Sequence, residues 1–166
     1  MNSKAAFLIG ALTAAPLASQ AEEAFVDFRV LTPSIATKLA QATLDHCAAA
    51  GYQIGVTVAD RFGLPQVFLR DRFAGLHVYE TSRRKAFTAV SFRTETSNLA
   101  ASTQAGQEAS SIRNLTEVLA LGGGLPIYDG NGALVAGIGV SGAPGPSIDE
   151  ECALAGLSAI EDDIAF

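Results

Sequence analysis

The chain has 166 residues, of which 49% are hydrophobic and 17% are charged. This proportion of apolar residues is enough to form a folded core, so the composition excludes an intrinsically disordered protein. The formal net charge is −6, whereas a nucleic-acid-binding domain normally presents a basic surface. We therefore expect no nucleic-acid partner, although several basic residues cluster between positions 70 and 93.

The N-terminal residues are typical of an export signal. Lys4 provides a positive charge, residues 5–17 form a short apolar run, and small residues follow it. This pattern predicts a signal peptide over residues 1–21 and a mature domain over residues 22–166. An uncleaved N-terminal anchor is the alternative. No later segment is apolar over the length that a bilayer requires, so we expect a periplasmic or secreted protein with no further membrane attachment.

The chain contains two cysteines, Cys47 and Cys152. An even number of cysteines in an oxidising compartment makes a disulfide a candidate. Both cysteines fall at or beside the apolar faces of predicted helices, and antiparallel packing of these helices would bring the two sulfurs together. The alternative is two separate buried thiols that act as small apolar side chains.

The first predicted elements are two helices on either side of a β-hairpin. Thr32, followed by a proline, is a good N-cap, so a helix begins there and ends near Ala50. Alternating and β-branched residues predict hairpin strands over residues 54–60 and 66–69. A second helix is predicted over residues 76–92.

The next predicted elements are mostly strands. After a weakly helical stretch and a loop, residues 115–121 are a candidate strand that the glycines at 122–124 interrupt. Residues 125–128 and 133–141 form a second predicted hairpin, because the Asp-Gly-Asn-Gly sequence at 129–132 favours a tight turn. The weakly helical stretch covers residues 97–108 and the loop covers residues 110–114.

A last helix completes the predicted domain. Ser147 and Glu150 match a capping box at its start. Its predicted buried face contains Ala153, Gly156, Leu157, Ile160 and Ile164. Hairpins with helices at both ends predict a single α+β domain, in which an antiparallel sheet is flanked by helices.

The second predicted helix carries the candidate ligand-binding residues. His77 and Glu80 are one turn apart and could both bind a metal ion, although a solvated pair at a helix start is the alternative. On a helical wheel Arg83 lies among the apolar residues of this helix, where a charged side chain needs a partner or a route to water. We expect an ion pair with Asp60 or Asp71, and the alternative is an anion site near an oligomer interface.

Other sites receive less support from the sequence. Arg84 and Lys85 could contact the same anion as Arg83, or they could simply be exposed. His46 is expected to be a packed imidazole at the edge of the first helix. The glycines at 122–124 lack the Lys-Ser or Lys-Thr of a phosphate-binding loop, and no nucleophile-elbow pattern surrounds Ser141.

Four segments, in this order and spacing, resemble the GlcG/HbpS family. They are VTVADRFG at 56–63, SRRKAFTA at 82–89, GGGLPI at 122–127 and AGIGVSG at 136–142, the last followed by Asp149 and residues 153–157. The resemblance extends over residues 31–160.

The resemblance implies a profilin-like α/β fold, assembly into homo-oligomers and binding of haem, or of corrinoids in some related domains. Some secreted members are linked to haem degradation and iron sensing. The chain is thus expected to be an exported protein that binds haem or a related tetrapyrrole. His77 or Tyr79 would meet the iron, and Arg83, Arg84 or Lys85 would meet the propionates. The alternatives are an enzyme that degrades haem or acts on a small organic acid, and an oligomeric domain without a cofactor.

Overall fold

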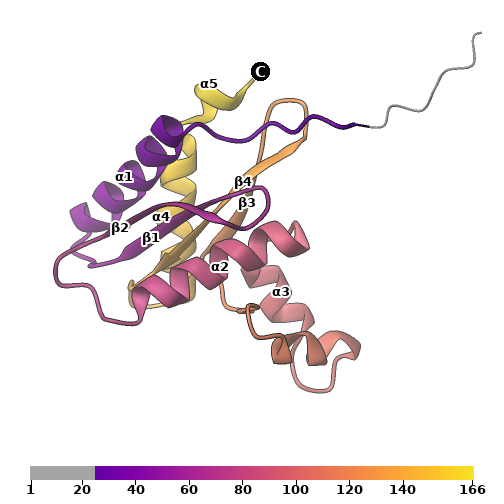
Figure 1. The fold of residues 1–166 in the computed structure, drawn as a ribbon. Helices are drawn as coiled ribbons and strands as arrows, with labels where there is room; N and C mark the ends of the chain where they lie inside the picture. The colour runs from indigo at the N-terminus through magenta and orange to yellow at the C-terminus, as the bar shows by residue number, and fades with distance from the viewer. Residues whose placement is uncertain (1–24) are drawn as a thin grey trace, which may run out of the picture.

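A four-stranded antiparallel sheet forms the centre of the computed structural model, which describes residues 25–166 (Figure 1). Along the sheet the strands are arranged in the order β2-β1-β4-β3. Their bounds are β1 Gly55–Asp60, β2 Pro65–Arg70, β3 Gly124–Tyr128 and β4 Leu134–Ser141. The predicted signal peptide, residues 1–21, lies outside the described residues.

Helices cover both faces of this sheet. α1 (Pro33–Ala49) and α4 (Pro146–Ser158) pack against each other on one face, and α2 (Val78–Phe92) covers the other face (Figure 1). The short α3 (Thr96–Ser102) extends from α2, and α5 (Glu161–Ile164) ends the chain. This arrangement confirms the predicted α+β domain. None of the described helices is long and apolar enough to cross a membrane.

The close packing of α2 on the sheet depends on glycines in β4. A Cβ added at Gly139 would collide with the carbonyl oxygen of Ser82, and one at Gly137 would collide with Val90. Small residues on α2, such as Ala86, complete the contact, and Ala86 is fully buried. The absence of a side chain at Gly137 and Gly139 therefore lets α2 lie close against β4.

A disulfide joins α1 to α4 across the other face. Cys47 and Cys152 are bonded, with their Cα atoms 5.7 Å apart and 105 positions apart in sequence. Both side chains are buried. A disulfide of this kind is consistent with an extracytoplasmic protein.

The predicted strand over residues 115–121 is wrong. This segment is irregular, and α2 pairs with its polar groups: the Leu119 amide donates to the Thr88 hydroxyl, and Arg84 donates to the Val118 carbonyl. Side chains thus satisfy backbone groups that a neighbouring strand would otherwise satisfy. The predicted loop just before it is part of a 3₁₀ helix, Glu108–Asn114.

The start of the last helix also differs from the prediction. Gly145 is the N-cap of α4 and Pro146 occupies the first turn, so Ser147 and Glu150 do not form a capping box. The Glu150 carboxylate instead accepts hydrogen bonds from the Gly123 amide and the Ser97 hydroxyl. The predicted single helix is divided at its end into α4 and α5, with Ile160 fully buried between them.

Candidate functional site

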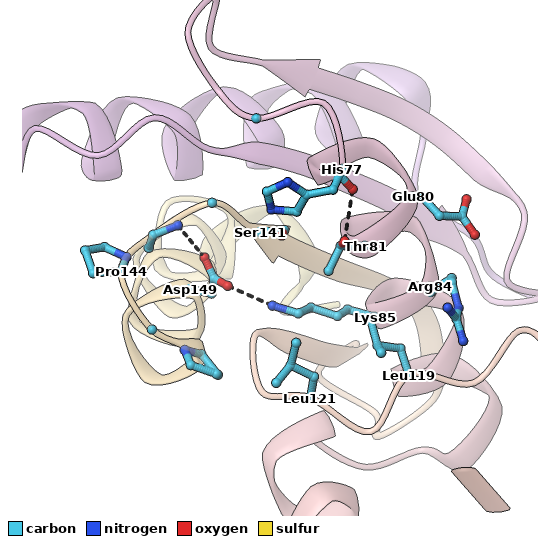
Figure 2. A pocket seen from close by; sticks show the side chains of 15 residues that line it. His77, Glu80, Thr81, Arg84, Lys85, Leu119, Leu121, Ser141, Pro144 and Asp149 are labelled. Carbon is cyan, nitrogen blue, oxygen red and sulfur yellow. Dashed lines mark hydrogen bonds and ion pairs between the residues drawn. The ribbon is translucent and has the colours of Figure 1, made fainter. Parts of the chain in front are cut away.

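A cavity of about 550 Å³ opens at the N-terminal end of α2. Its walls are the start of α2, the segment around Leu119 and Leu121, and the loop that connects β4 to α4 (Figure 2). Its apolar lining includes Pro144 and Pro146 as well as the two leucines. The mispredicted segment therefore forms a wall of the cavity.

A buried ion pair forms the floor of this cavity. The Lys85 ammonium is 2.7 Å from Oδ2 of Asp149 and donates to the Val140 carbonyl at 2.8 Å. The other carboxylate oxygen of Asp149 accepts from the Ala143 amide at 3.0 Å. Neither side chain is more than 6% exposed. The pair thus ties α2 to the loop that forms the opposite wall (Figure 2).

Burial changes the pKa values of both partners in the direction that favours the neutral form of each side chain. Desolvation lowers the pKa of Lys85 and raises the pKa of Asp149, and the attraction between the two charges opposes each shift. A Cβ added at Gly123 would lie 2.7 Å from Cβ of Asp149 and 3.0 Å from Nζ of Lys85. The glycine turn at 122–124 therefore makes room for this pair.

His77 and Arg84 supply polar groups to the cavity wall. His77 is exposed just before α2, its carbonyl accepts a hydrogen bond from Thr81, and its imidazole extends toward Asp149 in Figure 2. Gly75 permits this position, because a Cβ there would lie 2.7 Å from the imidazole carbon. The Nε atom of Arg84 is buried and has no hydrogen-bond partner within the described chain.

The structure separates Arg83 and Tyr79 from this cavity, although Glu80 lines its rim. Arg83 pairs with Glu80 and with Glu117, not with Asp60 or Asp71 as expected. The hydrogen bond from Arg83 lowers the pKa of the Glu80 carboxyl. Tyr79 packs edge-to-face on Phe68, with ring centroids 4.7 Å apart.

The burial of Lys85 and the exposure of His46 also differ from the predictions. Lys85 is fully buried, so the solvent-exposed alternative for it is wrong. His46 is exposed on α1 and is not a packed imidazole. No group of three or more potential metal ligands occurs within residues 25–166, and Glu80 is already held by Arg83.

Asp149, Leu119 and Leu121 line the cavity, but the sequence analysis assigned none of them a role in the site. The position of Asp149 in the first turn of α4 is common for an acidic residue at a helix start, so it gave no sign of a buried partner. The helical spacing did indicate that Lys85 is buried. It follows Val78 by seven residues and Ser82 by three, so the three residues share one face of α2, and this face is buried. The two leucines lie in an irregular segment without periodicity.

The comparisons with known proteins agree with this architecture. A family model described as haem-degrading protein HbpS-like matches residues 31–158. A double mutant of HbpS from Streptomyces reticuli is 39% identical, with 89% of this chain and 98% of that chain covered and a TM-score of 0.78. A second HbpS structure is 38% identical, with 86% and 98% coverage and a TM-score of 0.78.

A structure described as a PduOC:haem complex is more distant. It is 26% identical, with 79% of this chain and 95% of that chain covered and a TM-score of 0.75. A search of curated proteins finds no match. The family model covers well over half of the chain, and the HbpS structures align over nearly all of the described fold. The chain therefore belongs to the HbpS-like family that this model describes.

Proposed function

We propose that the chain binds haem or a related tetrapyrrole in the cavity at the start of α2. The observation that carries this proposal is the combination in one cavity of apolar walls, the His77 imidazole and the Arg84 guanidinium. Ligand sites are usually mostly apolar concavities with a few convergent polar groups. The description of the family as haem-degrading and the PduOC:haem complex support the same ligand class.

The residues present fit such a group. Leu119, Leu121 and Pro144 would contact the apolar macrocycle, and an imidazole nitrogen is a common protein ligand of haem iron. The unpartnered Nε of Arg84 could donate to a propionate carboxylate. Bound haem would supply redox-active iron, whereas Lys85 and Asp149 would keep the cavity wall in place.

A hemin titration followed by Soret absorbance tests this proposal. We expect a shifted Soret band for the wild type and a changed band for His77→Ala. Loss of a charge-assisted hydrogen bond in Arg84→Gln should weaken binding by about tenfold or more. His46→Ala is the matched control, because His46 is an exposed histidine on α1 that does not line the cavity. Variants of His77 and Arg84 that both behave like His46→Ala would contradict this assignment.

A second candidate function is haem degradation, which the family description favours. Product analysis after incubation with hemin and a reductant or peroxide separates this activity from binding alone. Release of iron and loss of the Soret band, both dependent on the protein, would support an enzyme. Intact hemin recovered after incubation would support a binding role.

We also propose that the protein works outside the cytoplasm. The disulfide between Cys47 and Cys152 supports this location, as does the signal-like composition of residues 1–21. Mass spectrometry of protein from the periplasm or the medium should give an N-terminus near Glu22. Recovery of intact Met1 on cytoplasmic protein would contradict it.

A further inference from the structure

A second cavity, of about 340 Å³, lies at the C-terminal end of α2. It is bounded by the extended segment before α1, the β1–β2 turn and the last residues of α2. Its lining contains three phenylalanines, two arginines and no carboxylate: Phe28, Phe62, Phe87, Arg61 and Arg93, together with Gly63, Val90, Ser91 and Leu134. None of these residues lines the proposed haem cavity.

Aromatic rings hold the first guanidinium, that of Arg61. Its central carbon lies 4.1 Å from the ring centroid of Phe28 and 5.8 Å from that of Phe62. The two rings contact each other edge-to-face at 5.6 Å. Stacking occupies the face of a guanidinium and leaves its N–H edge free to bind a carboxylate. The carboxylate of the neighbouring Asp60 instead accepts from the amides of the turn.

The second arginine of the lining, Arg93, is exposed at the C-terminal end of α2. With φ of 53° and ψ of 38°, this residue adopts the left-handed conformation at the end of α2. Within residues 25–166 it is the single residue other than glycine with a positive φ. Its carbonyl accepts a hydrogen bond from the Tyr128 hydroxyl. A left-handed residue commonly ends a helix, and here it places Arg93 at the edge of the cavity.

Neither Arg61 nor Arg93 forms an ion pair within the described chain, whose five ion pairs use other residues. The apolar part of the lining depends on Gly63, where a Cβ would lie 2.8 Å from the Phe87 ring. Two free guanidinium groups favour an anion, and the phenylalanine rings favour an apolar body. We propose that this cavity binds a small organic anion that combines one carboxylate with an aromatic or branched apolar group.

Ligand-observed NMR with phenylpropanoate, compared with phenylpropanol, tests this proposal. We expect saturation transfer to the acid, with amide shifts of ¹⁵N-labelled protein at Gly63 and not at Gly145 in the other cavity. Arg61→Gln should weaken binding by about tenfold or more, since a charge-assisted hydrogen bond is lost. Arg93→Asn should have a similar effect, and asparagine tolerates the left-handed conformation.

Arg72→Gln is the matched control, because Arg72 also stacks on a phenylalanine, at 4.7 Å from the Phe73 ring, but outside this cavity. Its affinity for phenylpropanoate should equal that of the wild type. Equal binding of phenylpropanol, equal losses in all three variants, or shifts centred on Gly145 would overturn the proposal. So would hemin that shifts Gly63 and loses affinity in Arg61→Gln, because the cavity would then belong to haem. Unchanged amide spectra elsewhere will show that the variants are folded.

Discussion

Lys85 is the largest fully buried side chain in the described structure. An isolated ammonium group in a protein interior is strongly unfavourable, so its position depends on Asp149 and the Val140 carbonyl. The same contacts fix the loop after β4, which forms a wall of the proposed haem cavity. This ion pair therefore links the stability of the domain to the shape of the cavity.

We expect Lys85→Met to destabilise the fold by about 3–5 kcal/mol, because it leaves the Asp149 carboxylate buried without a counter-charge. Adding Asp149→Asn should recover part of this loss, since the amide oxygen can still accept from Ala143. Urea unfolding measures both effects. Lys38→Met is the control, because it breaks an exposed pair with Asp163 and should cost at most about 1 kcal/mol. Purely additive losses in the double variant would contradict the coupling.

Gly139 in β4 and Gly145 before α4 allow a comparison of a crowded position with an open one. Gly139→Ser would place Cβ against the backbone of α2, and overpacking of this kind costs about 1–3 kcal/mol or more. Gly145→Ser adds the same side chain where no atom lies within 4 Å, at the N-cap of α4, and should be neutral or slightly stabilising. Thermal unfolding of the two variants measures the difference, and equal melting temperatures would contradict the packing of α2 on β4.

The charged residue buried on α2 is Lys85, which lies two positions after Arg83, the residue that was expected in the apolar stripe. The apolar stripe expected around Arg83 contains Leu76, Tyr79, Ala86, Phe87 and Val90. Ala86 and Val90 are indeed buried on α2, but Leu76 and Tyr79 are not. Both are exposed, Leu76 by 95%. The buried face instead consists of small residues that pack on the β4 glycines, and it includes Lys85. Hydrophobicity alone could not identify this face, because small residues are only weakly apolar.

At the scale of elements, the β3–β4 turn depends on one carboxylate. Oδ1 of Asp129 accepts from the amides of Asn131 and Ala133, and Oδ2 pairs with Arg29 of the segment before α1. The pKa of Asp129 is lowered below its ordinary value, mainly by the hydrogen bond from the Ala133 amide. The hydrogen bonds from Asn131 and Arg29 lower it further. The turn thus fixes the hairpin and the incoming chain together.

The lowered pKa predicts an acid-dependent contribution to stability. A carboxylate with a depressed folded-state pKa stabilises the fold fully above its unfolded-state pKa, which is ordinarily 3.8, and this contribution disappears as the pH falls through the folded-state pKa. We expect Asp129→Asn to flatten the loss of stability below this pH. Urea unfolding from pH 7 down to about 2 tests it, with Asp163→Asn, in an exposed ion pair, as the control. An unchanged profile for Asp129→Asn would contradict the role of the carboxylate.

Elements with strong local signals were predicted well. The Thr32 cap accepts a hydrogen bond from the Ile35 amide as expected, and both hairpins occur close to their predicted bounds. The segment over residues 115–121 was mispredicted because its apolar residues match a strand, whereas its backbone is bonded to side chains of α2. Such long-range bonds leave no periodicity in the sequence.

At the scale of the whole molecule, we propose that the protein forms a homo-oligomer. Large apolar side chains are exposed near the start of α2, where Phe73 is 73% and Leu76 is 95% exposed, and such exposure is typical of interfaces. Light scattering should give a mass several times that of one chain. Replacement of both residues, Phe73→Ser and Leu76→Ser, should lower that mass. A monomeric wild type would contradict the proposal.

The disulfide is the covalent link between the two ends of the described domain. Cys47 and Cys152 close a loop across 105 positions, which includes the whole sheet. A crosslink stabilises mainly by restricting the unfolded chain, and the chain-entropy model gives about 4–5 kcal/mol for a loop of this size. Because both cysteines are buried on the face opposite α2, reduction removes the crosslink while the thiols can keep their packing contacts.

We therefore expect a reductant to lower the free energy of unfolding of the wild type by about 3–5 kcal/mol. The double variant Cys47→Ala/Cys152→Ala should lose somewhat more, because it also leaves a small cavity, and the reductant should not affect it further. Urea unfolding with and without reductant measures these differences. Thiol counting in denaturant, on protein from its native compartment, should find no free thiol before reduction. Two free thiols per chain, or a reductant effect of the same size in the double variant, would contradict the crosslink as the source of this stability.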